Sequence, residues 1–127
     1  MKKTLIAALI TSTVAFGTFA GAATATEPAM MGTTSMGKAW VDANGMALYT
    51  YDKDKDGKSM CNGKCAIEWP PLAAAKDAKA AGDWTVVMRD DGSKMWAFKG
   101  HPLYTFVEDK KPGEVTGDNK DGFHLAK

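Results

Sequence analysis

The sequence predicts a small all-β protein, an antiparallel sandwich or barrel of two pseudo-symmetric repeats with one short helical linker. Three observations lead to this prediction. A tyrosine-centred motif occurs twice, each copy is rich in strand-forming residues, and turn dipeptides that contain glycine separate the candidate strands. An alanine-rich stretch between the two copies has the composition of a helix.

The duplicated motif is centred on a tyrosine in a short strand. Residues 45–54 have the sequence GMALYTYDKD, and residues 100–109 have the sequence GHPLYTFVED. Gly, Leu, Tyr, Thr, a second aromatic residue and the final Asp recur in register, 55 positions apart. A tryptophan precedes each copy, and a turn-rich segment ending in an aromatic residue follows each copy. This agreement on both sides indicates that a whole folding unit is duplicated.

Turn dipeptides place the strands in order along the chain. Asn44-Gly45 predicts a hairpin between a strand around Trp40-Val41 and the first tyrosine strand. Asp91-Gly92 predicts a second hairpin, and Lys99-Gly100 then leads into the second tyrosine strand. The expected core is aromatic, with Trp40, Tyr49, Trp69, Trp84, Trp96, Tyr104 and Phe123 as its members.

The segment that joins the two repeats has a helical composition. It is alanine-rich over 73–81 and is stopped by Gly82. We therefore expect repeat one over 38–72, a helical linker over 73–82 and repeat two over 83–127.

The first residues have the pattern of a secretory signal peptide. Lys2 and Lys3 precede an uncharged stretch over 5–20, and small residues then offer cleavage near 22 or 25. The stretch is too short and too rich in polar residues for a membrane span, and no cysteine follows it that could accept a lipid. We expect loss of residues 1–25, a flexible leader over 26–37 and one domain over 38–127. The product is expected in the periplasm or the medium, neither lipid-anchored nor integral to the membrane.

The charge balance and the two cysteines indicate which kinds of partner and which sulfur chemistry to expect. The chain has 16 basic and 15 acidic side chains, which argues against nucleic acid as a partner. Cys61 and Cys65 are the only cysteines, and in an oxidising compartment we expect them to form a structural disulfide. The alternative is a thiol–disulfide redox pair, although such pairs usually have C-x-x-C spacing.

The repeat motifs resemble those of a known family. The segments Tyr49-x-Tyr51-x-x-Asp54 and Tyr104-x-Phe106-x-x-Asp109 are similar to the Y-x-[FWY]-x-x-D motif of a bacterial secreted-repeat (predicted lipoprotein) family. The resemblance extends from Trp40 to Ala126, and it includes the C-x-x-x-C segment and the Trp-Pro-Pro-Leu that follows. It implies an exported, duplicated protein whose activity is uncharacterised. Many members are lipoproteins, but we expect no lipid anchor on this chain because it lacks the lipid-accepting cysteine.

The motif itself has two interpretations, a ligand site or a structural device. Two aromatic residues at alternate strand positions share one face and can fill a core. The aspartate that follows each strand, Asp54 or Asp109, can cap a turn through its side-chain oxygens. We favour the structural interpretation, because duplicated residues are those that each unit needs in order to fold.

Metal or haem binding is the most specific alternative function. His101 stands where the first copy has Met46, so the two would approach each other if the halves pack about a pseudo-twofold axis. A His/Met set suits copper, and His124 is the other histidine of the chain. Residues 52–57 imitate the start of a calcium loop, but Gly63 stands at the twelfth position in place of a bidentate glutamate, which argues against calcium.

No catalytic pattern emerges from the sequence. It contains no G-x-S-x-G elbow and no H-E-x-x-H motif, and its carboxylates lie in lysine-rich turns. We therefore expect a non-catalytic exported module that binds an envelope component or a small ligand, with copper or haem binding and thiol redox chemistry as alternatives.

Overall fold

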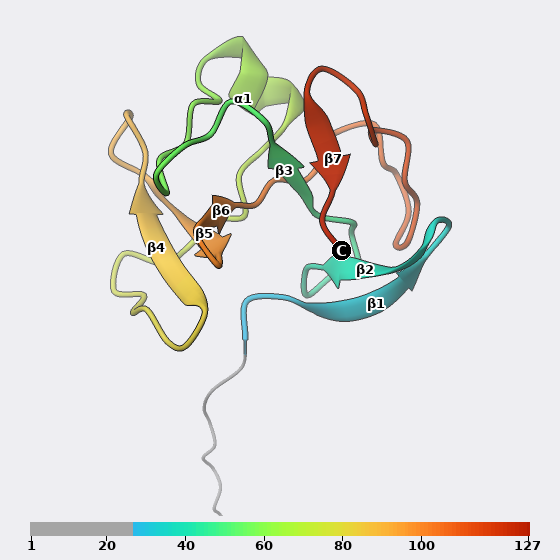
Figure 1. Cartoon of the computed structure of the whole chain (residues 1–127), viewed down its shortest axis with the longest axis horizontal. Coiled ribbons are helices and arrows are strands. Elements are labelled where there is room, and N and C mark those ends of the chain that lie inside the picture. Colours follow the sequence, from blue (N-terminus) through green and yellow to red (C-terminus); the bar gives the residue numbers. More distant parts are fainter. Residues whose placement is uncertain (1–26) are drawn as a thin grey trace, which may run out of the picture.

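The computed structural model describes residues 27–127 and shows an all-β architecture of antiparallel strands. In chain order the elements are β1 (Met30–Thr34), β2 (Gly37–Val41), β3 (Tyr49–Tyr51), α1 (Lys64–Glu68), β4 (Trp84–Met88), β5 (Lys94–Phe98), β6 (His101–Pro102) and β7 (Phe123–Leu125). β1 pairs with β2, β3 pairs with β7, and β4, β5 and β6 form a three-stranded sheet. In Figure 1, β3 lies between the β1–β2 hairpin and the three-stranded sheet. These sheets do not close into a barrel within 27–127.

The segment expected to be a flexible leader is instead part of the fold. β1 pairs with β2 over its whole length, from Met30 opposite Val41 to Thr34 opposite Gly37. The Thr34 hydroxyl closes the hairpin by donating to the Gly37 carbonyl at 2.7 Å. The prediction failed because this strand, with the sequence MMGTT, is held by backbone pairing and lacks the apolar alternation that marks a strand in the sequence.

The three predicted turns are confirmed. After the turn at Asn44-Gly45, Ala47 pairs with Val41. The turn at Asp91-Gly92 joins β4 to β5, and the Gly92 N–H donates to the Arg89 carbonyl at 2.9 Å. The turn at Lys99-Gly100 joins β5 to β6.

The helical linker expected over 73–82 does not form. Ala73 makes a β-bridge with Met95, and the Ala74 N–H donates to the Lys94 carbonyl at 2.9 Å. Ala73 and Ala74 thus lie beside β5 on the side where it also pairs with β6, and pairing with this strand outweighs their intrinsic preference for a helix. The short helix of the described chain is α1, which begins one residue before Cys65.

The two repeats exchange their final segments. β7, at the end of repeat two, pairs with β3 of repeat one and places Leu125 opposite Tyr49. In the same way Pro71, at the end of repeat one, makes a β-bridge with Tyr104 of repeat two. Tyr49 and Tyr104 also pair directly, with reciprocal backbone N–H···O distances of 2.8 and 2.9 Å. A pseudo-twofold axis therefore relates the two tyrosines, and each half of the molecule contains segments from both repeats.

A closed triangle of backbone hydrogen bonds occurs once in each half. In one half the Trp40 N–H donates to Ala126, Ala126 to Leu48 and Leu48 to Trp40, at 2.8–3.0 Å. In the other half the triangle joins Trp96, Leu72 and Leu103 at 2.9–3.2 Å. Trp40 is therefore equivalent to Trp96, and Ala126 to Leu72. This equivalence locates corresponding positions in the two halves.

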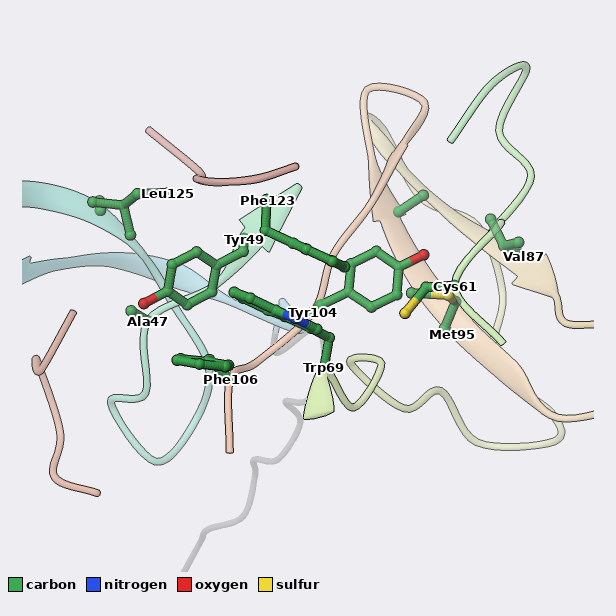
Figure 2. Close-up of a cluster of buried hydrophobic side chains, with 12 residues drawn as sticks. Ala47, Tyr49, Cys61, Trp69, Val87, Met95, Tyr104, Phe106, Phe123 and Leu125 are labelled. Atoms are coloured by element: carbon green, nitrogen blue, oxygen red, sulfur yellow. The ribbon is translucent and has the colours of Figure 1, made fainter. Parts of the chain in front are cut away.

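The core contains a stack of four aromatic rings that alternate between the repeats. The order is Tyr51, Phe123, Trp69 and Phe106, with neighbouring ring centroids 4.2, 3.8 and 4.1 Å apart. Figure 2 shows Phe123, Trp69 and Phe106 edge-on, one above the other. Of the expected core residues, Tyr49, Trp69, Trp84, Tyr104 and Phe123 are buried, whereas Trp40 and Trp96 are half-buried. The second aromatic residue of each motif is therefore an outer ring of the stack.

Candidate functional site

The polar ends of the repeat motif pair across the two repeats. The Tyr49 hydroxyl donates to Asp109 Oδ2 at 2.6 Å, and the Tyr104 hydroxyl donates to Asp54 Oδ2 at 2.7 Å. The two hydroxyls point to opposite sides of the ring stack (Figure 2). Each tyrosine therefore binds the aspartate of the other copy of the motif. The sequence could not show this exchange, because pairing within one copy and pairing between the copies would each give every tyrosine an aspartate.

Each aspartate also holds the loop that follows it. Asp54 Oδ1 accepts the Met60 N–H at 2.7 Å, and Asp109 Oδ1 accepts the Thr116 N–H at 2.8 Å and its hydroxyl at 2.6 Å. A side-chain oxygen that accepts a backbone N–H fixes a turn. The motif aspartate thus acts as a loop anchor and as the acceptor for a buried tyrosine.

Arg89 extends one of these two networks. This residue is the chain's single arginine and is only 4% exposed. Its Nη1 donates to Ser59 Oγ at 2.9 Å, and its Nη2 donates to the Cys61 carbonyl at 2.8 Å. Ser59 Oγ lies 2.6 Å from the Tyr104 hydroxyl, which gives a continuous line from Arg89 to Asp54. The sequence analysis missed Arg89; the one available signal was an arginine in a chain whose other cationic side chains are lysines.

The electrostatics of these networks favour a structural role. Burial is the largest cause that raises the pKa of Tyr49 and of Tyr104 far above the usual value, and the neighbouring aspartates act in the same direction. Burial also raises the pKa of Asp54, while the Met60 N–H, Tyr104 and Arg89 act in the opposite direction. Both tyrosines therefore stay protonated hydrogen-bond donors, and Ser59, at 2% exposure, cannot reach a substrate in solution.

The expected disulfide is present and closes a short ring that ends at the second residue of α1. Cys61 and Cys65 are joined, and Cys61 is completely buried. Because Arg89 donates to the Cys61 carbonyl, this ring is also tied to the β4–β5 hairpin. Arg89 therefore holds the loop that carries Ser59 and Cys61 against the second repeat.

Loss of this bridge is expected to lower the free energy of unfolding by about 2 kcal/mol, from the chain entropy of a five-residue loop. Urea unfolding of the Cys61→Ala/Cys65→Ala variant against the oxidised protein measures this difference. A change below about 0.5 kcal/mol would show that the ring contributes no restraint beyond the surrounding packing.

The residues of the copper hypothesis lie at separate places. Met46 follows the turn at Asn44-Gly45, and His101 begins β6 at the equivalent corner of the other half. His124 uses both ring nitrogens, at 2.7 Å from Asp52 Oδ2 and 2.8 Å from Asn119 Oδ1. Within 27–127, no three His, Cys, Asp or Glu side chains are grouped so that they could hold a metal ion.

The carboxylates of the calcium-like segment have other partners. Asp52 pairs with His124, whereas Asp54 turns inward to Tyr104 and Met60. The two side chains therefore serve different parts of the fold.

An open hollow lies beside the three-stranded sheet. It has a volume of about 280 Å³ and is lined by Trp40, Thr50, Phe98, Lys99, His101, Leu103, Leu125, Ala126 and Lys127. The half-buried rings of Trp40 and Phe98 lie 4.6 Å apart at an angle of 50°. Lys99 Nζ is 5.4 Å from the centre of the Phe98 ring, within the range of a cation–π contact. This hollow combines accessible aromatic surface with positive charge, and we call it the aromatic hollow.

Comparison with known proteins agrees with the duplicated architecture. A family model described as a secreted repeat of unknown function matches residues 30–73 and again residues 85–124. Searches of curated proteins and of solved structures found no match. Among the residues that the structure describes, no helix is long and apolar enough to cross a membrane. The predicted signal peptide, 1–25, lies outside the described residues.

Proposed function

Because the chain belongs to this family of secreted repeats, we propose that it is an exported, non-catalytic binding module whose ligand site is the aromatic hollow. Export follows from the predicted signal peptide and agrees with the description of the family. The mature protein then resides in the periplasm or the medium as one domain that includes β1.

The observation that carries this proposal is the half-exposed aromatic pair inside an open hollow. Most aromatic rings of the described chain are used in the buried stack or in cross-repeat contacts. Trp40 and Phe98, in contrast, present ring surface to a space of about 280 Å³, close to the lower limit for small-molecule sites. Such a space suits a ligand of one to three rings.

The positions of the polar groups support the proposal of a non-catalytic module. The hydroxyls of Ser59, Tyr49 and Tyr104 are buried and bonded, and none of them lines the aromatic hollow. The burial of Cys61 also supports a structural role for the disulfide, since it leaves only the half-buried Cys65 sulfur open to a partner thiol. The side chains that do line the hollow include the aromatic rings of Trp40 and Phe98 and the charged Lys99, which can bind a ligand by packing and by charge.

N-phenyl-1-naphthylamine, an uncharged aromatic dye, provides a direct test. We expect saturable one-to-one binding, seen as a rise in dye fluorescence, and at least a tenfold loss of affinity in Thr50→Phe. Thr50 lines the hollow, so a phenyl ring at this position fills the space that the ligand would occupy. The matched control is Thr105→Phe, at the equivalent position of repeat two, which does not line the hollow. Equal binding by both variants, or no saturable binding by the unmodified protein, would refute the proposed site.

A further inference from the structure

The aromatic hollow has a counterpart in the other half of the molecule. A second hollow, also of about 280 Å³, is lined by Pro28, Asp42, Ala43, Asn44, Leu72, Ala73 and Trp96. Trp96 is equivalent to Trp40 and Leu72 to Ala126, as the two triangles of backbone hydrogen bonds establish. The duplicated fold therefore produces the same concave corner twice.

The two hollows differ in their aromatic and charged residues. Val41 pairs with Ala47, and Ala97 pairs with Pro102 at the same place in the other half. Asp42, which follows Val41, therefore stands where the aromatic hollow has Phe98. Ala43 follows Asp42 as Lys99 follows Phe98, but in a connection that is one residue longer. One copy of the corner thus carries an aromatic ring and a cation, and the other carries a carboxylate and a methyl group. Because the copy with Asp42 also folds, an aromatic ring at this position is not needed to build the corner.

Lys99 adopts a backbone conformation that lysine disfavours. Its φ is 51°, and Gly100 follows with φ of 85°, so two consecutive residues of this tight turn are left-handed. Asparagine, aspartate and glycine are the residues that such a hairpin turn prefers at the first position. A lysine held there against its conformational preference indicates that its charge has a use outside the turn.

We infer that the aromatic hollow binds a small organic anion, an aromatic carboxylate or sulfonate, whose negative group pairs with Lys99 and whose ring packs against Trp40 and Phe98. This inference rests on the proposed function and adds the ligand class. Charge complementarity carries it, because the Lys99 ammonium group lines this hollow whereas no aspartate or glutamate does. The second hollow has the opposite character, since Asp42 is its charged residue.

Two dyes with the same ring system test the ligand class. 8-Anilinonaphthalene-1-sulfonate carries the rings of N-phenyl-1-naphthylamine and one added sulfonate. We expect Lys99→Asn to lower the affinity for the sulfonate about fivefold and to leave the affinity for the uncharged dye unchanged. Raising the salt concentration from 20 mM to 500 mM should weaken binding of the sulfonate alone, because ions screen an exposed charge pair. The control is Lys53→Asn, which removes one exposed charge from a turn outside the hollow and should alter neither affinity.

The outcomes separate the two proposals. If neither dye binds, the proposed function fails together with the ligand class. If both dyes bind with affinities that Lys99→Asn and salt do not change, the hollow is a binding site but the anion inference is wrong. Thermal unfolding adds an independent readout: Lys99→Asn should raise the midpoint, because asparagine tolerates the left-handed conformation. A lowered midpoint would assign Lys99 to the fold and overturn the inference.

Discussion

Replacement of Trp69 by alanine is expected to lower the free energy of unfolding by about 3–5 kcal/mol, the largest single-residue effect in the molecule. Trp69 is 1% exposed and stacks on Phe123 on one side and Phe106 on the other. Both of these neighbours come from repeat two, so the substitution removes contact between the repeats as well as core volume. Urea unfolding followed by circular dichroism measures the loss.

Trp69→Phe is the matched control for this prediction. Phe123 is the ring equivalent to Trp69 in the other repeat, so phenylalanine already occupies the corresponding position of the stack. The buried Trp69 Nε1 has no hydrogen-bond partner among the described residues, so phenylalanine also removes an unsatisfied donor. We expect the phenylalanine variant to retain most of the stability. Equal losses in both variants would show that the indole, and not the stack, determines the stability.

The crossed tyrosine–aspartate pairs give the second large prediction. A double-mutant cycle between Tyr49→Phe and Asp109→Asn should yield a coupling energy of about 1.5–3 kcal/mol, the range for a buried hydrogen bond to a charged group. Their oxygens are 2.6 Å apart, and Asp109 is 5% exposed. Each free energy of unfolding is measured by urea titration at pH 7.

The control cycle combines Tyr49→Phe with Asp54→Asn. These two residues belong to the same copy of the motif, but Asp54 accepts from Tyr104. Their coupling energy is therefore expected to be close to zero, within about 0.5 kcal/mol. A larger coupling within the motif than between the motifs would contradict the exchange of partners seen in the structure.

This exchange also changes what the repeat means physically. Each copy of the sequence motif supplies a tyrosine to one network and an aspartate to the other. Likewise β7 completes the strand pair of β3, and the segment around Pro71 completes that of Tyr104. A single repeat would therefore expose unpaired strands and unpaired buried donors, which are costly. The two repeats together therefore form one folding unit.

Local signals in the sequence were enough for the strands, the turns and the duplication. Asn44-Gly45 and Asp91-Gly92 mark hairpins because the glycine in each adopts positive φ, a conformation set by these few residues themselves. The aromatic composition of the core followed from the same short-range pattern. The disulfide was predictable because the chain has only two cysteines.

The errors occurred where distant segments override local preference. Ala73 and Ala74 pair with β5 instead of starting a helix, and residues 30–34 form β1 although their sequence has no strand periodicity. Both outcomes depend on backbone groups that only a partner strand can satisfy. The burial of Arg89 has the same origin, since its acceptors Ser59 and Cys61 belong to the other repeat.

The sequence by itself therefore determined the class of fold, the duplication, the disulfide and the exported character expected of the chain. Only the tertiary structure decided which repeat each tyrosine, aspartate and final strand would pair with. It also decided that Phe98 and Lys99 would lie beside Trp40 in the aromatic hollow. The reason is that the motif is identical in kind in both copies, so each side chain has two chemically equivalent partners. Chain geometry in three dimensions selects between them.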